Sequence, residues 1–314
     1  MPPIRQRGIA LITAVLVVAI AAIIATSMMS RQNFDTRRTA NIIHQDQAIA
    51  YALGAEYWAG VELSKDAEQN NYDHLQENWA YDLPPLPIDG GYINGRIEDL
   101  QGRFNLNSVL DPLQAERFAR LCLAINVDPD FIPALQDWID GDTEAREQGA
   151  EDETYTRMVP PYRAANGFLA DTSELLLVRG VSVQEYNALT FYISALPAGS
   201  AINVNTASPQ LLQSLAHDVA VPDIERIIGI RAGAPYQDID YFLADEAFAG
   251  REISDEYLSV GSQYFLLTAD VMLGDAPLTL QSVLYRTPEG KMTVIKRRLG
   301  PSRELILTQF GGNF

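Results

Sequence analysis

The stretch RGIALITAVLVVAIAAIIATSMM, residues 7–29, decides the architecture of this chain of 314 residues. After Gly8 it runs from Ile9 to Met29 without a charged side chain. A helix needs about 20 such residues to cross the hydrocarbon core of a bilayer. We therefore predict a single transmembrane helix over residues 9–29, which anchors the rest of the chain to a membrane.

A short basic leader, residues 1–8, precedes the apolar run. It contains Arg5 and Arg7 and no acidic side chain. One interpretation is an uncleaved signal anchor. The other follows from Arg7-Gly8-Ile9, which resembles the type IV prepilin processing site. This resemblance implies that a membrane prepilin peptidase cuts after Gly8 and that the new amino group of Ile9 is methylated.

Composition restricts the class of partner. The chain has 23 Lys and Arg against 41 Asp and Glu, a net charge of −18, so its field repels phosphate backbones. We therefore expect no nucleic-acid partner. Cys122 is the sole cysteine, which rules out an intramolecular disulfide, and its apolar neighbours predict a buried side chain.

A second helical pattern continues the first after the membrane segment. Apolar side chains recur at spacings of seven and four residues, which predicts an amphipathic stem helix to about residue 64 whose apolar stripe covers other structure: Ile42, Ile49, Leu53, Tyr57 and Val61. The run Leu83-Pro84-Pro85-Leu86-Pro87 predicts a loop, because proline does not fit inside a helix.

Strand patterns flank a long central region. One covers residues 92–100, and three more, with turn signals between them, lie near the end of the chain at 264–272, 278–285 and 292–299. A stem helix packed on such an antiparallel sheet gives an α+β fold of the type IV pilin-like kind. Residues 103–258 then form a large, mostly α-helical insertion.

The insertion contains an internal repeat. Phe104-Asn105-Leu106-Asn107-Ser108 reappears 98 residues later as Ile202-Asn203-Val204-Asn205-Thr206. Each copy is an extended segment that ends in a candidate helix N-cap, so we predict two related helical subdomains. They resemble SAM-like or helix-hairpin-helix units, which often bind DNA. Residues 103–258 carry 10 Arg, no Lys and 25 acidic side chains, which favours a protein scaffold instead.

The most chemically specific stretch is acidic. Asp140, Asp142 and Glu144 alternate around a glycine, and Glu151 and Asp152 follow. Alternating carboxylates let several oxygens converge on one point, as Ca²⁺ requires with its roughly six to eight oxygen ligands. No histidine lies in this stretch, which argues against zinc. The pattern resembles the start of an EF-hand loop without its last Glu, so a solvated acidic loop stays open as the alternative.

The residues around this stretch carry a more specific resemblance. Their order resembles the signature of the minor pseudopilin K family of type II secretion systems: Trp138-Ile139-Asp140, Asp142, Glu151-Asp152, Tyr155, Pro161-Tyr162, Asn166 and Ser173-Glu174-Leu175. Thr13 fits the same family, which lacks the Glu that other pilin-like subunits have at mature position five. The resemblance implies a structural Ca²⁺ in the insertion, with these candidate ligands: Asp140, Asp142, Glu144, Glu151 and Asp152.

The resemblance also implies where the protein acts. It implies a non-catalytic subunit at the tip of the periplasmic pseudopilus, in complex with minor pseudopilins I and J and joined to the other pseudopilins of the fibre, in support of protein export. Residues 9–29 then cross the bacterial inner membrane once, with the globular domain in the periplasm. A carboxylate at position 13 is costly in lipid without a partner ahead, so Thr13 marks a leading position. A minor pilin at a type IV pilus tip is the alternative.

No catalytic pattern accompanies these features. The sequence contains no nucleophile elbow, phosphate loop or dinucleotide fingerprint, and its three histidines are scattered, so we expect no enzymatic activity. The predicted units are a leader (1–8), a membrane helix (9–29), a stem with the first strand (30–102), two insertion subdomains (103–201 and 202–258) and the closing strands (259–314).

Overall fold

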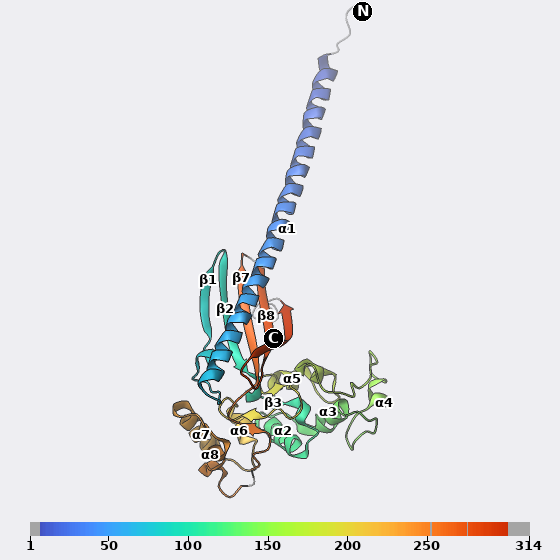
Figure 1. Cartoon of the computed structure of the whole chain (residues 1–314). Coiled ribbons are helices and arrows are strands. Elements are labelled where there is room, and N and C mark those ends of the chain that lie inside the picture. Colours follow the sequence, from blue (N-terminus) through green and yellow to red (C-terminus); the bar gives the residue numbers. More distant parts are fainter. Residues whose placement is uncertain (1–6, 252, 275, 301–314) are drawn as a thin grey trace, which may run out of the picture.

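The longest element of the computed structural model is helix α1, Arg7–Gln69, within the described residues 7–251, 253–274 and 276–300. It joins the predicted membrane helix and the predicted stem without a break. At 1.5 Å per residue, its 63 residues span about 95 Å. The first half of α1 projects as a bare rod, and the rest of the chain gathers around its far end (Figure 1).

A five-stranded antiparallel sheet packs against the second half of α1. Its strand order is β1-β2-β7-β8-β9, and its strands are β1, Leu83–Ile88; β2, Gly91–Asp99; β7, Tyr264–Leu273; β8, Ala276–Arg286; and β9, Met292–Gly300. Strand β2 pairs directly with β7, so the residues between them form an insertion at one end of the sheet. The predicted stem helix on an antiparallel sheet is confirmed, and four strands match their predicted ranges to within two residues at each end.

The loop predicted at Leu83–Pro87 is wrong, because this segment forms β1. It lies at the edge of the sheet and pairs only with β2, with an irregular register between Leu83 and Leu86. Proline lacks a ladder donor, but an edge strand needs donors on one side alone. The three prolines also leave this edge poorly suited to pairing with another strand.

The stripe of α1 that faces the sheet is not the predicted one. Three of the buried side chains are small, with Ala48, Ala52 and Ala59 at most 1% exposed, and they lie in one apolar cluster with Phe265 and Leu280. Three residues of the predicted stripe point outward instead: Ile42, Leu53 and Tyr57. Periodicity alone favoured the large side chains, whereas close packing on the sheet selects the alanines.

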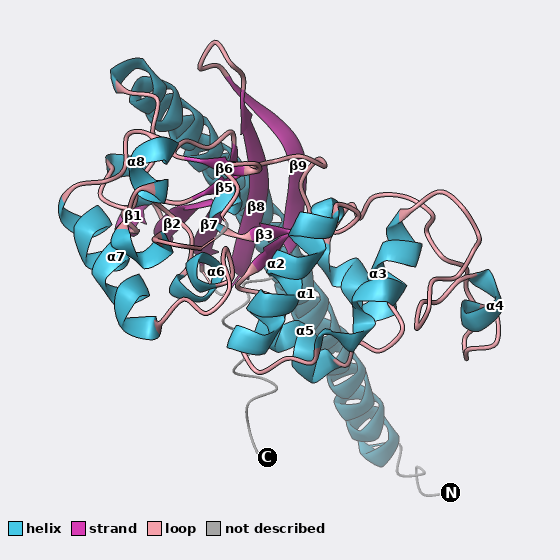
Figure 2. Ribbon diagram, turned by 90° about the horizontal axis from the view of Figure 1, so that it is seen from below, coloured by secondary structure: helices cyan, strands magenta, loops and turns pink. Residues whose placement is uncertain are grey.

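The regular secondary structure of the insertion consists mainly of short helices, and the insertion has its own apolar core. Its first copy contains α2, Pro112–Ala124; α3, Ile132–Ile139; α4, Asp152–Tyr155; and α5, Val183–Leu189. The second contains α6, Pro209–Gln213; α7, Val221–Gly233; and α8, Ile239–Leu243. Helices α3 and α4 lie at one side of the insertion and α7 and α8 at the other (Figure 2).

Each copy of the repeat opens with a two-residue strand that pairs in parallel with a strand at its close. These pairs are β3, Phe104–Asn105, with β4, Ile193–Ser194, and β5, Ile202–Asn203, with β6, Leu258–Ser259. The second Asn of each motif exchanges two hydrogen bonds with one distant backbone unit: Asn107 with Leu169, and Asn205 with Tyr236. We call each such pair of hydrogen bonds an amide clasp. The internal repeat therefore contains two matching amide clasps.

The helix caps differ from the predicted ones. Ser108 and Thr206 end the two motifs, but Asp111 caps α2 by accepting a hydrogen bond from the amide of Gln114. Ser208 caps α6 in the same way. The motif residues are used in the clasps and their turns, so the chain reaches each helix two or three residues later than predicted.

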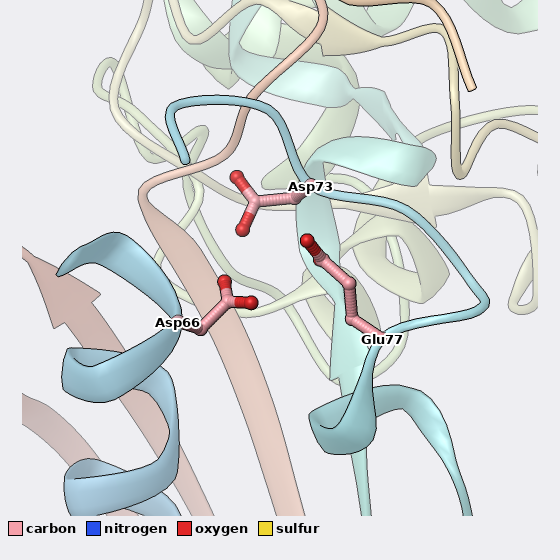
Figure 3. A group of neighbouring side chains, drawn as sticks. All are labelled: Asp66, Asp73 and Glu77. Atoms are coloured by element: carbon pink, nitrogen blue, oxygen red, sulfur yellow. The ribbon is translucent and has the colours of Figure 1, made fainter. Parts of the chain in front are cut away.

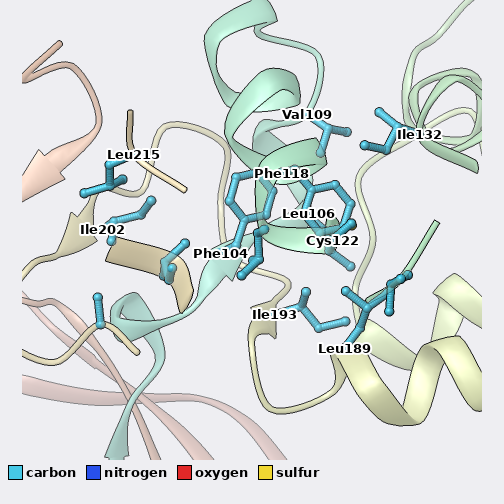
Figure 4. Packing of buried hydrophobic residues seen from close by; sticks show 14 of the residues in the cluster. Phe104, Leu106, Val109, Phe118, Cys122, Ile132, Leu189, Ile193, Ile202 and Leu215 are labelled. Carbon is cyan, nitrogen blue, oxygen red and sulfur yellow. The ribbon is translucent and has the colours of Figure 1, made fainter. Parts of the chain in front are cut away.

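A mainly aliphatic core with one stacked pair of phenylalanine rings supports the start of the insertion (Figure 4). The rings of Phe104 and Phe118 are stacked with centroids 4.7 Å apart, which ties β3 to α2. Cys122 is fully buried beside them, as predicted, and burial raises the pKa of its thiol to about 12. The insertion thus has a rigid base from which its acidic segment projects.

Candidate metal centre and a second acidic cluster

The acidic segment of the insertion is held at both of its ends. Helix α3 buries Trp138 and ends at Ile139, and the backbone becomes extended at Asp140. The chain returns at α4, whose buried Tyr155 meets Trp138 edge-to-face with centroids 5.1 Å apart. This aromatic contact brings Asp140 and Glu151 together, although eleven positions separate them. We call residues 140–151 the acidic loop.

Three carboxylates converge in the acidic loop. Asp140, Asp142 and Glu151 each offer an oxygen within 4.8 Å of the other two. Glu151 is 5% exposed, and neither of its carboxylate oxygens has a hydrogen-bond partner among the described residues. Burial, and then the neighbouring carboxylates of Asp137, Asp140 and Asp142, raise the pKa of Glu151. Buried, unpartnered oxygens of one sign are costly, and a hard cation such as Ca²⁺ would satisfy them.

Two of the five predicted ligands lie outside this group. The Asp152 carboxylate accepts a hydrogen bond from the amide of Ala164 at 3.0 Å and lies 3.6 Å from Arg163. The side chain of Glu144 is exposed, and its amide donates to Asp142 at 2.8 Å. The arrangement in the structure thus selects Asp140, Asp142 and Glu151 from the predicted set.

Sequence reasoning missed the support of this group. Asp137 is fully buried beneath the loop, and the guanidinium of Arg146 contacts both Asp137, at 2.7 Å, and Asp140. Gly149 packs so closely on Asp137 that a Cβ at this position would lie 1.9 Å from the carboxylate. The one available signal was that Asp137 directly precedes the signature tryptophan.

A second group of three acidic side chains lies where α1 meets the sheet and the insertion. Asp66, Asp73 and Glu77 point toward a common centre (Figure 3), again with oxygens within 4.8 Å of one another. Arg286 of β8 reaches this group, with its guanidinium 3.2 Å from Asp66 and hydrogen-bonded to Asp73. We call these four residues the acidic junction.

The acidic junction is supplied with hydrogen-bond donors. The Glu77 carboxylate accepts from the indole of Trp79 at 2.7 Å and from the amide of His74 at 3.0 Å. Asp73 accepts from the amide of Ser262 at 2.6 Å as well as from Arg286. A metal cation here would compete with the guanidinium of Arg286. We therefore interpret the acidic junction as an internal ion pair and not as a metal site. No sequence signal pairs Arg286 with residues more than 200 positions earlier.

The N-terminal site residues lie in α1. The helix includes Gly8 and Ile9, whose backbone is helical like that of Thr13 further along. Residues 1–6 of the predicted leader lie outside the described residues. From Leu11 onward α1 contains an 18-residue window of mean hydropathy 2.6 with none of it buried, so α1 is a candidate membrane span.

A long helix on an antiparallel sheet, with a helical insertion between two neighbouring strands, defines a pilin-like subunit. Two family models described as type II secretion system (T2SS) protein K match residues 102–198 and 202–261. The chain belongs to the type II secretion system protein K family, a minor pseudopilin family.

Curated relatives agree over nearly the whole chain. The type II secretion system protein K of Pseudomonas aeruginosa is 36% identical, with 94% of this chain and 93% of that one covered. That of Aeromonas hydrophila is 32% identical, with 94% and 98% covered. A crystal structure of the GspK-GspI-GspJ complex from enterotoxigenic Escherichia coli contains a chain 28% identical, with a TM-score of 0.76; the match covers 84% of this chain and 100% of that one.

Proposed function

We propose that this protein is a non-catalytic minor pseudopilin that caps the tip of a type II secretion pseudopilus together with minor pseudopilins I and J. The observation that carries the proposal is the match to the whole of a chain crystallised in a complex with those two partners, at a TM-score of 0.76. The proposed tip complex supports protein export across the outer membrane and joins the other pseudopilins of the fibre below it.

Two features of the chain favour a position of this subunit at the tip of the fibre. The insertion spreads sideways from the end of α1 that lies far from the N-terminus (Figure 1), in the space that a subunit ahead would need in a close-packed fibre. Thr13 offers no carboxylate to pair with the terminal amine of a preceding subunit. A subunit with nothing ahead avoids the cost of an unpaired carboxylate in lipid.

The partners can be tested with the full chain in membranes. Co-expressed with minor pseudopilins I and J, it should be recovered in a one-to-one-to-one complex, and gold-labelled antibody should mark fibre ends. Label distributed along the fibre would refute the tip position. Recovery with type IV pilins, and without I and J, would favour the alternative of a minor pilin at a type IV pilus tip.

Membrane insertion and processing complete the proposal. In it, α1 crosses the inner membrane once at residues 9–29, with the globular domain in the periplasm, after the prepilin peptidase has removed residues 1–8. The basic leader that ends in Gly8 supports this order of events. Mass analysis of membrane-extracted protein should find a methylated Ile9 at the start of the chain, whereas a retained Met1 contradicts the cleavage.

The acidic loop is proposed to hold a structural Ca²⁺. Asp140, Asp142 and Glu151 are the residues placed to bind it, and the bound ion would supply the positive charge that the unpartnered oxygens of Asp140 and Glu151 need. Asp137 and Arg146 shape the loop from beneath without a comparable set of unpartnered oxygens. In this proposal the ion fixes the outline of the distal end of the insertion and takes part in no reaction.

A further inference from the structure

The insertion is fastened to the pilin-like scaffold by a buried polar network that surrounds the acidic junction. The amide group of Asn203, from the second repeat motif, donates to the backbone oxygen of Asp73 at 3.0 Å and to the carboxylate of Asp99 at 3.0 Å. Asp99, at the end of β2, also accepts from Thr206 and Ser262, each at 2.6 Å. The network thus joins α1, the segment after it, the sheet and the insertion.

The charges in this network do not balance when every acid is ionised. The groups that face one another are Asp66 from α1, Asp73, His74 and Glu77 from the following segment, Asp99 from β2 and Arg286 from β8. Strand β7 contributes the ring of Phe265, 4.9 Å from the guanidinium carbon of Arg286. The network therefore contains four carboxylates and one guanidinium, which contacts Asp66 and Asp73, with a histidine beside Glu77, in a setting that is largely closed to water.

We propose that the acidic junction is a pH-responsive lock, in which a proton held between Asp66 and Asp73 keeps the insertion fastened to the scaffold and loss of that proton loosens it. Asp66 and Asp73 both contact Arg286, so a proton between them leaves one carboxylate to balance the guanidinium. Without the proton, two adjacent carboxylates repel, and Asp66, at the last turn of α1, is the one that can turn toward solvent.

The pKa values support this direction. Burial, and then the carboxylates of Glu77 and Asp73, raise the pKa of Asp66 to about 7, and burial raises the pKa of Asp73 as well. Burial raises the pKa of Asp99 to about 6. A carboxyl group with a raised pKa in the closed state stabilises that state at low pH and loses its contribution as the pH rises through the raised value.

Hydrogen exchange of the full chain in detergent micelles tests the lock. The amides of Asp73 and Ser262 are direct reporters, because one donates to Val260 and the other to the Asp73 carboxylate. After correction for the intrinsic rate, their exchange should accelerate up to about tenfold between pH 6 and pH 8, as expected for a group with a pKa near 7. Equal protection at both pH values would overturn the proposal.

Variants identify the group responsible. Asp66→Asn should remove most of the acceleration and leave the smaller part that Asp99 contributes, whereas Glu68→Gln, which neutralises an exposed acid two positions away on α1, should leave it as in the wild type. If Asp66→Asn does not fold, Glu77→Gln serves instead and should move the transition to lower pH, since the Glu77 charge helps to raise the pKa of Asp66. A transition that neither change affects would assign the response to another group and reject the lock.

Discussion

The acidic loop and the acidic junction each bring three carboxylates within 4.8 Å of one another, yet their surroundings differ. In the loop, the oxygens of the buried Glu151 have no partner among the described residues. In the junction, Arg286 and a set of backbone and side-chain donors meet the carboxylates. The spacing of the carboxylates is similar in both clusters, so it does not distinguish a candidate cation site from an internal ion pair. The hydrogen-bond donors and positive charges around each cluster do.

The largest expected effect comes from removing the counter-charge of the junction. Arg286→Met should destabilise the protein by about 3–5 kcal/mol at pH 8, because it leaves buried carboxylates uncompensated. Chemical unfolding of the full chain in micelles measures this. Arg298→Met, at an exposed position on β9, is the control and should change stability little. A similar loss in both variants would mean that the buried Arg286 contributes no more to stability than an exposed arginine, and it would contradict the contrast between the two clusters.

The next effect concerns the acidic loop, where Arg146 contacts Asp140 but both oxygens of Glu151 have no partner among the described residues, so the further positive charge must come from a bound ion. Chelation of Ca²⁺ should lower the melting temperature, because a ligand present at 100 times its dissociation constant contributes about 2.7 kcal/mol. The double variant Asp140→Asn with Asp142→Asn should melt at one temperature with or without chelator. Glu153→Gln, at an exposed site in the same segment, should keep the response. If chelation does not change the melting temperature of the wild type, the alternative interpretation of a solvated acidic loop is favoured.

The smallest effect tests the sign of the pH dependence at a second contact between scaffold and insertion. Lys296 of β9 donates to the Asp171 carboxylate at 2.7 Å. Burial of Asp171 is outweighed by the hydrogen bonds from Lys296 and Ser173, so its pKa falls to about 2. A carboxyl group with a lowered pKa stabilises the folded protein at pH values above its ordinary pKa. This contribution is lost as the pH falls through the lowered pKa, which is opposite in sign to the effect of Asp66.

Lys296→Met should therefore cost at most about 1 kcal/mol near neutral pH, as for other partly exposed pairs. The loss should fade as the pH falls through about 2, because Asp171 becomes protonated in both proteins below that value. Melting curves of the variant and of the wild type at several pH values check this. A penalty that grows as the pH falls would show that this contact and the junction respond with the same sign.

Local patterns predicted much of the fold. The apolar run over residues 9–29, the closing strands and the two Asn-x-Asn motifs were recognised because each depends on residues that are neighbours in sequence. The acidic loop was recognised for the same reason, although only Asp140, Asp142 and Glu151 of the five predicted ligands converge. Spacing along the chain indicates which carboxylates are near, but the contact of Trp138 with Tyr155 selects the ones that meet.

By itself, the sequence determined a candidate membrane helix, a stem on an antiparallel sheet and an acidic helical insertion, because hydrophobic periodicity and turn residues act over short distances. The tertiary structure alone decided that the alanine stripe of α1 faces the sheet, that the prolines of β1 form an edge strand, and that Arg286 enters the junction. Each of these depends on a partner far away in the chain. Close packing and charge balance are set by such partners, and no local pattern contains them.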